Sequence, residues 1–526
     1  MNRSFIALSL IVVGALASPF ARAELTDLTQ TPNLANEGIA KSLSDEIGAG
    51  RGDVTLPGSS VYVIARDPFR AIRRGRQLFQ RKFTVEQGFG PRFEDGVGED
   101  IGKTPALGAG LADSCAACHG RPRGSAGAGG DVFTRPDSRD APHLFGLGLQ
   151  EMLADEMTTD LRGEQAQAVA QAARTQRAVT VSLATKGIAF GRLTANPDGT
   201  RDASGVQGVD ADLRVKPFFA HGGAFSIRQF VVGALNDEMG LQSPDPVLAA
   251  AAGGARVVTP SGLVLDGRFD KLNAPAATDG DADPDGDGIA NEIDPALVDY
   301  MEFYLLNYFK PGTYEKTALT EIGRRALQQF GCTDCHRPSL TIQADRRVAD
   351  VATVYDPLHG IFNALFATAT PLFHETSDDP TLPPLRQPNR APFVVENFYS
   401  DLKRHDLGAK FWERNFDGSL HREFVTEPLW GVGTTAPYGH DGRSVNLNEV
   451  ILRHGGEAQR ARDLYAAASD AVQIAVRAFL ESLVLFPPDD TASNLNPGDP
   501  TAPNFPQKGH GSIRLAPLFL DPSDPE

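Results

Sequence analysis

The chain of 526 residues is short of several features that would define other classes of protein. After its first residues it has no run of about 18 continuous apolar residues, so no membrane-spanning helix is expected there. Basic residues number 50 against 67 acidic ones, and the formal net charge of −17 disfavours nucleic acid as a partner. It suits a soluble protein that meets basic partners or neutral small molecules. Apolar residues at 41% and charged residues at 22% fit a globular chain of one to three domains.

The first residues have the pattern of a cleavable export signal. Arg3 supplies a positive charge, and the apolar stretch over 5–16 is too short to span a bilayer comfortably. The small-residue pattern Ala21-Arg22-Ala23 marks a cleavage site, so we expect residues 1–23 to be removed and the mature chain to begin near Glu24. The alternative is an uncleaved anchor. The mature protein is therefore expected in the periplasm, with an extracellular location as the other possibility.

Cysteine is equally scarce, and its placement indicates a prosthetic group rather than disulfide bonds. All four cysteines fall in two motifs, Cys115-Ala-Ala-Cys118-His119 and Cys332-Thr-Asp-Cys335-His336. C-x-x-C-H attaches c-type haem: two thiols on one turn form thioethers, and the histidine binds the iron. A split zinc site would leave both histidines unexplained, and two redox thiol pairs of the cytosolic type conflict with export. The sequence therefore predicts two covalent haem c groups.

Hydrophobic periodicity predicts a mostly α fold in which two cytochrome-c-like haem units carry long loops and few short strands. Helices are expected over 66–80, 146–185, 226–235, 296–309, 316–330 and 471–485. A break at Pro311-Gly312 divides an N-terminal haem unit with insertions, 24–310, from a C-terminal cytochrome c domain, 311–487. The tail over 488–526 is rich in proline and aspartate, which predicts irregular structure.

An acidic loop over 283–294 has the spacing of a calcium site. Its oxygen-bearing residues are Asp283, Asp285, Asp287, Asn291 and Asp294, with the carbonyl of Ile289 as a further ligand. Gly288 occupies the sharp-turn position. Hard oxygen ligands at this alternation suit Ca²⁺, and the alternative is a solvated acidic turn. Bound Ca²⁺ would fix the segment ahead of the second haem unit.

The C-terminal unit resembles the diheme cytochrome c peroxidase superfamily, and within it the "di-haem oxidoreductase, putative peroxidase" family. The resemblance rests on the two spaced C-x-x-C-H motifs and on Thr435-Ala-Pro437-Tyr-Gly-His440-Asp441-Gly442. In the superfamily an axial ligand lies 14 residues after this histidine, which is His454 here. The peroxidases usually carry methionine there, so the resemblance implies a bis-His haem, His336/His454, of lower potential. The alternative is a histidine on the helix surface.

A second likeness lies in the N-terminal unit. Phe218-Phe219-Ala220-His221-Gly222 followed by Asn236-Asp-Glu238-Met239-Gly240 is similar to the peroxidase segment that passes over the open face of the first haem. The resemblance maps the acid–base carboxylate to Glu238, which would take a proton from peroxide and return it. The alternative is an exposed acid at a helix end.

The departures from the peroxidase pattern open other functions. Ala220 replaces a tryptophan thought to relay electrons, and Phe230 stands where the peroxidases place glutamine. An apolar pocket would favour a small neutral ligand. The leading expectation is reduction of hydrogen peroxide or a related small oxidant at the first haem, with electrons from a small cytochrome c or cupredoxin passing through the second. The alternatives are an oxygenase acting on an apolar substrate with O₂, and a non-catalytic electron carrier. The sixth position of the first haem is open, or taken by His143 or His221.

Overall fold

The computed structural model describes most of the chain between residues 43 and 484. The described residues are 43–81, 83, 115, 119, 141–239, 241–272, 292–308, 310–355, 365–415 and 418–484. The expected export signal, Cys118, the C-terminal tail and all predicted calcium ligands except Asp294 lie outside them.

Within these residues the fold is largely helical. Its α-helices are α1 (Leu43–Ile47), α2 (Ser60–Arg66), α3 (Pro68–Gln80), α6 (Leu147–Thr175), α7 (Ile227–Asp237), α8 (Pro246–Ala252), α9 (Pro295–Asn307), α10 (Ala318–Gln329), α11 (Leu447–Arg453), α12 (Gln459–Ala467) and α13 (Asp470–Glu481). The expected helices over 66–80, 226–235, 296–309, 316–330 and 471–485 correspond to α3, α7, α9, α10 and α13. The prediction of a mostly α fold is thus met in outline.

Short antiparallel sheets are more numerous than predicted. The strands are β1 (Val179–Thr185), β2 (Ile188–Ala195), β3 (Arg201–Asp202), β4 (Arg256–Val258), β5 (Val264–Asp266), β6 (Ser339–Ile342), β7 (Ala349–Tyr355), β8 (Leu365–Pro371), β9 (Phe373–Thr376), β10 (Leu385–Pro388), β11 (Phe393–Glu396), β12 (Arg404–Asp406), β13 (Glu413–Arg414), β14 (Leu420–His421) and β15 (Glu423–Val425). They pair as β1-β2-β3, β4-β5, β6-β11, β7-β8, β9-β10, β12-β15 and β13-β14. Ten of them follow the second haem motif, where sequence analysis expected loops.

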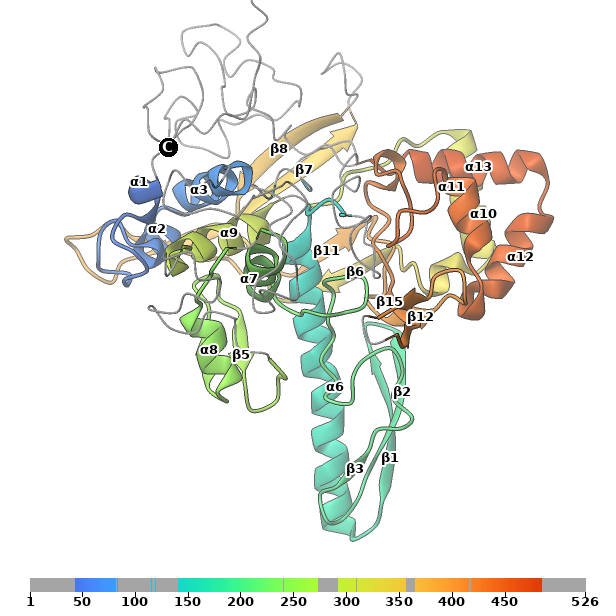
Figure 1. Cartoon of the computed structure of the whole chain (residues 1–526), viewed down its shortest axis with the longest axis horizontal. Helices are drawn as coiled ribbons and strands as arrows, with labels where there is room; N and C mark the ends of the chain where they lie inside the picture. The colour runs from blue at the N-terminus through green and yellow to red at the C-terminus, as the bar shows by residue number, and fades with distance from the viewer. Residues whose placement is uncertain are drawn as a thin grey trace, which may run out of the picture.

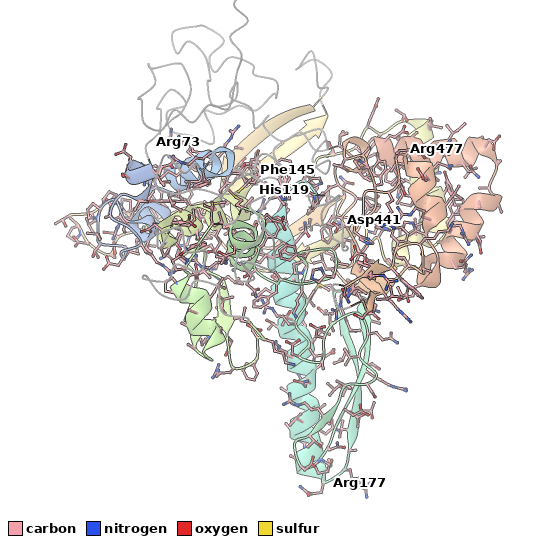
Figure 2. All side chains as sticks on the ribbon, in the orientation of Figure 1. Arg73, His119, Phe145, Arg177, Asp441 and Arg477 are labelled. Atoms are coloured by element: carbon pink, nitrogen blue, oxygen red, sulfur yellow. The ribbon has the colours of Figure 1, made fainter. Side chains whose placement is uncertain are left out.

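An arm formed by α6 and the β1–β3 sheet projects from the molecule, with Arg177 at its tip (Figures 1 and 2). The predicted helix over 146–185 is wrong at its end, because α6 stops at Thr175 and 179–185 is strand β1. The β-branched residues of this segment favour a strand. Its exposed and covered positions also alternate, as they do in a strand that lies against a helix.

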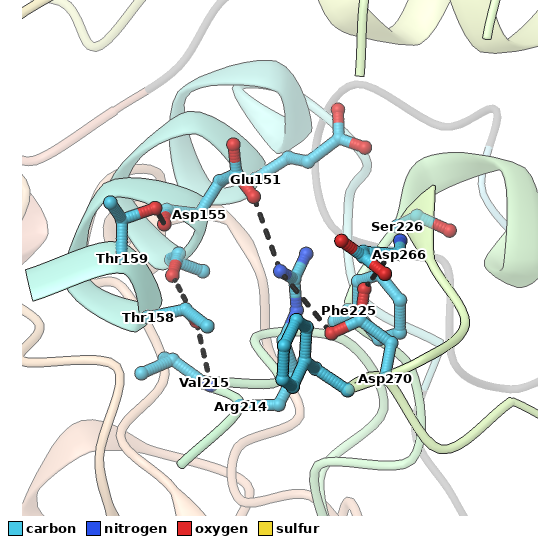
Figure 3. Close-up of polar contacts among 12 residues, drawn as sticks. Glu151, Asp155, Thr158, Thr159, Arg214, Val215, Phe225, Ser226, Asp266 and Asp270 are labelled. Atoms are coloured by element: carbon cyan, nitrogen blue, oxygen red, sulfur yellow. Dashed lines mark hydrogen bonds and ion pairs between the residues drawn. The ribbon is translucent and has the colours of Figure 1, made fainter. Parts of the chain in front are cut away.

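Polar contacts fix the base of this arm to the body (Figure 3). Arg214 approaches Asp155 of α6 at 3.2 Å and Asp270 at 3.7 Å, and its guanidinium lies 3.8 Å from the ring centroid of Phe225. The backbone N–H of Val215 donates to the Thr158 hydroxyl at 3.0 Å. Pairing keeps the buried guanidinium from being left as an isolated charge.

A buried ion cluster joins α7 to α9. Arg228 lies 2.6 Å from Asp245, 2.8 Å from Asp299 and 2.8 Å from Glu302, and all four side chains are fully buried. Ser60 at the start of α2 donates to Asp299 at 2.5 Å. Removing one member would leave an uncompensated charge in the interior, which costs about 3–5 kcal/mol.

The described residues form two apolar cores. One extends from Leu43 to Trp430 and includes β6, β7 and β11 side chains such as Leu340 and Val395. The other joins α10, α11 and α13 around Phe479. Figure 1 shows α10–α13 together at one end of the molecule, away from α1–α3 and α7–α9. Among the described residues, no helix has the length and apolar character that crossing a bilayer requires.

Candidate haem-binding sites

The second C-x-x-C-H motif begins directly after α10. Gly331 takes φ +85°, and Cys332–Asp334 form one 3-10 turn. The N–H of His336 donates to the Cys332 carbonyl at 3.0 Å, so both thiols and the imidazole lie on a single turn. Cys332 and Cys335 are free thiols, and burial raises the pKa of the Cys332 thiol to about 11. This placement is what attachment of one haem through two thioethers requires.

The backbone orients the imidazole of His336. Its Nδ1 donates to the Tyr399 carbonyl at 2.9 Å, which leaves Nε2 to bind iron. Burial lowers the pKa of His336, partly offset by that carbonyl. The ring is therefore neutral near pH 7, as a metal ligand must be.

His454 is held in the same way from the opposite element of this unit. It follows α11, and its Nδ1 donates to the Val450 carbonyl at 2.7 Å. Burial lowers its pKa to about 4, the Val450 carbonyl opposes this, and the nearby His336 lowers the pKa further. His336 and His454 are thus close enough to interact electrostatically, each with Nε2 left over. Their arrangement fits a bis-His haem.

Phe411 lies between the rings of His454 and His440, and His440 has aromatic and charged neighbours of its own. The Phe411 ring lies 5.3 Å from the His454 ring and 5.9 Å from that of His440, and His440 stacks on Phe424 at 3.9 Å. His440 Nε2 is 2.9 Å from a Glu413 oxygen. Phe411, Phe424 and Glu413 therefore hold the His440 ring in place beside His454.

His405 forms a polar cluster beside this motif that sequence analysis did not resolve. Its Nε2 is 2.9 Å from Asp401, its Nδ1 is 2.8 Å from Glu457, and Nδ1 is also 3.9 Å from the sulfur of Cys335. Burial, the largest single influence, opposes the charged ring, but the interactions with Asp401 and Cys335 together outweigh it and raise the pKa of His405 to about 11. A positive charge therefore stands next to one haem-attachment sulfur. The Asp401-x-x-x-His405 spacing was the available signal.

Of the first motif, Cys115 and His119 lie within the described residues. Nδ1 of His119 donates to the Pro142 carbonyl at 2.6 Å, so this ring too is oriented by the backbone, with Nε2 left over. Burial lowers its pKa. Figure 2 places His119 and Phe145 in the middle of the molecule. The geometry fits an iron ligand.

The two candidates for the sixth position differ in their surroundings. His143 donates from Nε2 to the Trp430 carbonyl at 3.0 Å and stacks on Phe145 at 5.6 Å. Burial lowers the pKa of His143 to about 4, and the Trp430 carbonyl partly opposes this. His119 lowers the pKa further, which indicates that the two histidines lie near each other. Its buried Nδ1 has no hydrogen-bond partner among the described residues. His221 instead contacts Phe219 and His421, at 6.1 and 5.7 Å between ring centroids.

Three phenylalanines gather beside His119. The rings of Phe230 and His119 are 6.2 Å apart, and Phe218 and Phe219 lie 6.1 and 5.4 Å from Phe230. These are ordinary distances for aromatic pairs. The surroundings of the first site are therefore strongly apolar, as the phenylalanine at position 230 indicated.

Glu238 lies directly after α7, where its N–H donates to the Ala234 carbonyl at 3.0 Å. It follows Phe230 by eight residues, which separates the two backbones by about 12 Å along the helix. Its catalytic role stays a prediction. Asp294, the one predicted calcium ligand within the described residues, caps α9 by accepting from the N–H of Ala296 at 2.8 Å. That bond uses one carboxylate oxygen, Oδ1.

Comparison with known proteins bears on the C-terminal unit. Residues 387–483 match the model of a family described as "Di-haem oxidoreductase, putative peroxidase". The match covers His405, His440 and His454 and confirms the family resemblance noted from the sequence. The search of curated proteins gave no match.

Proposed function

We propose that this chain, whose residues 387–483 match the di-haem oxidoreductase family, is a periplasmic di-haem c-type cytochrome that reduces hydrogen peroxide or a related small oxidant. One observation carries the proposal. His336 and His454 come from different elements, interact with each other, and each has Nδ1 tied to a backbone carbonyl. With Nδ1 of each ring bonded to a carbonyl, Nε2 of each ring would be the atom that binds a metal-bearing group.

The haem groups, when bound, would supply one-electron redox chemistry and an iron at which a small oxidant binds. Cys115 and Cys118 would attach the first, Cys332 and Cys335 the second. His336 and His454 would both bind the second haem, which would then serve electron entry and storage. His119 holds the first site, where catalysis takes place.

Residues of the first site support the reaction in different ways. Phe230, on which Phe218 and Phe219 pack, presents an apolar ring to His119. Glu238 moves the proton, taking it from the incoming peroxide and returning it to the leaving oxygen. The sixth position is open, or held by His143 or His221 until substrate arrives.

Partners and the calcium loop complete the proposal. A small cytochrome c or cupredoxin delivers electrons, and the net charge of −17 favours a donor with a basic face. Residues 1–23 direct export. Asp283, Asp285, Asp287, Ile289, Asn291 and Asp294 bind Ca²⁺ ahead of the second unit.

A second function is favoured by the aromatic cluster itself. An apolar wall beside His119 suits O₂ and an apolar organic substrate better than polar cleavage of peroxide. The chain would then be a di-haem oxygenase. If both haems proved six-coordinate and inert, it would be an electron carrier.

The test starts with the purified mature holoprotein. Mass spectrometry should show two added haem masses, and EPR with optical titration should show one low-spin and one ligand-accessible haem. Steady-state turnover with peroxide and a reduced small cytochrome separates peroxidase from oxygenase. A wholly low-spin protein that binds neither cyanide nor CO would leave only the carrier.

A further inference from the structure

The hydrogen bonds that orient His119 continue toward the C-terminal unit. Nδ1 of His119 donates to the carbonyl of Pro142. The next residue, His143, donates from Nε2 to the carbonyl of Trp430 at 3.0 Å. Two hydrogen bonds and the short stretch of chain from Pro142 to His143 therefore join the first haem motif to Trp430.

The hydrogen bond that orients His336 leads to the same tryptophan. His336 donates to the carbonyl of Tyr399, and the preceding residue is Phe398. The rings of Phe398 and Trp430 have centroids 4.9 Å apart. A second connection runs through the backbone, because the N–H of Leu429 donates to the Phe398 carbonyl at 3.1 Å.

Both aromatic rings are fixed in the interior. Trp430 is 3% exposed and Phe398 is fully buried. A Cβ atom at Gly146, which takes φ +78°, would lie 2.7 Å from Cζ2 of Trp430, so this glycine lets the indole lie directly on the start of α6. Rigid, water-free contacts couple two redox centres better than gaps through solvent.

We infer that Trp430 and Phe398 form the electron-transfer bridge between the two haem sites. The inference rests on the proposed function in requiring a haem at each motif. One electron leaves the iron held by His336 and arrives at the iron held by His119. No bond forms or breaks, and no net proton moves. Trp430 and Phe398 couple the two sites and are not consumed.

The other tryptophan provides a matched control. Trp412 donates from Nε1 to Asp406 at 2.8 Å and lies under the guanidinium of Arg422 at 4.4 Å. Neither contact belongs to the chain of bonds between His119 and His336. Substitution of Trp412 should leave inter-haem transfer unchanged.

The experiment injects one electron into the oxidised holoprotein by flash photoreduction and follows its redistribution between the two haem absorption bands. Trp430→Leu should slow this step by about tenfold, equivalent to about 1.4 kcal/mol in activation free energy. Trp430→Phe should slow it less, and Phe398→Leu should also slow it. Trp412→Phe should match the parent. Unchanged haem spectra in each variant show that the sites themselves are intact.

Rates in Trp430→Leu and Phe398→Leu that equal the parental rate, with both haems intact, would overturn the bridge. If Trp430→Leu does not fold, the milder Trp430→Phe and the independent Phe398→Leu decide. Peroxide plays no part in the measurement. If the variants show the expected slowing but the protein does not turn over peroxide, the bridge is supported and the peroxidase function is rejected. A chain without two haems overturns both.

Discussion

Replacement of Gly323 by alanine should disturb the helix pair that supports the second haem motif. A Cβ atom built at Gly323 of α10 falls well inside the 3.0 Å that real Cβ atoms keep from a neighbour, here the Ala475 carbonyl of α13. To restore an ordinary contact of 3.4 Å, α10 and α13 would have to move apart by about 1.5 Å. Overpacking costs about 1–3 kcal/mol, and the better helix propensity of alanine returns about 1 kcal/mol. Because the obstacle is backbone, we expect a net loss of about 2 kcal/mol.

The displacement should also reach the iron ligands. Phe479 of α13 packs on Tyr399 at 5.6 Å, and the Tyr399 carbonyl orients His336. A ligand set tolerates about 0.5 Å of misplacement, so a 1.5 Å shift should convert part of the low-spin haem to high spin. Thermal unfolding measures the first effect and EPR the second.

Gly163 of α6 supplies the matched control, because its Cβ would meet nothing within 4 Å. Gly163→Ala should stabilise the arm by up to about 1 kcal/mol and leave the haem spectra unchanged. The essential result is that Gly323→Ala lowers the free energy of unfolding whereas Gly163→Ala raises it. A Gly323→Ala protein as stable as the parent, with a fully low-spin second haem, would refute the reasoning.

Three further results are expected. His454→Met should raise the reduction potential of the second haem in a redox titration, and an unchanged potential would remove His454 from the iron. Glu238→Gln should lower kcat for peroxide by on the order of a hundredfold, whereas unchanged turnover would end its proposed role. Burial raises the pKa of Glu151 to about 7, so the folded state holds a proton that the unfolded state has lost. Stability from this group should therefore fall as pH rises from about 4.5 to 7, by at most about 3 kcal/mol, and Glu151→Gln should flatten that part of a Tm-against-pH profile.

Local patterns in the sequence were enough for the longer helices, whereas the short helices α1, α2, α8, α11 and α12 were not predicted. The α10 segment has a threonine cap at Thr317 and apolar residues at helical spacing, so its bounds follow from neighbouring residues. The end of α6 was misjudged because alanine and leucine continue past Thr175, while the strand signal of β1 overlaps the helical one. Most strands between 339 and 425 have four residues or fewer, and β6 pairs with β11 from a distant part of the chain, so periodicity alone gives little signal for them.

The candidate sites likewise combine features that local sequence predicts with features that only tertiary packing creates. The haem motifs and the position of His454 could be predicted, because chemistry fixes residue type and spacing over a few positions. The contact of His143 with Trp430 joins residues 287 positions apart, and only tertiary packing creates it. The charged cluster at His405 likewise needs Glu457 to arrive from a distant loop.

The three candidate iron-binding imidazoles share one consequence of being anchored to main-chain carbonyls, at Pro142, Tyr399 and Val450. A carboxylate acceptor would draw the proton from Nδ1 and make the ligand more basic, and a point mutation could remove it. A peptide oxygen draws on the proton less strongly, and side-chain substitution does not remove it. The electron-donating strength of these ligands is therefore insulated from side-chain change, and it shifts only when the backbone itself moves.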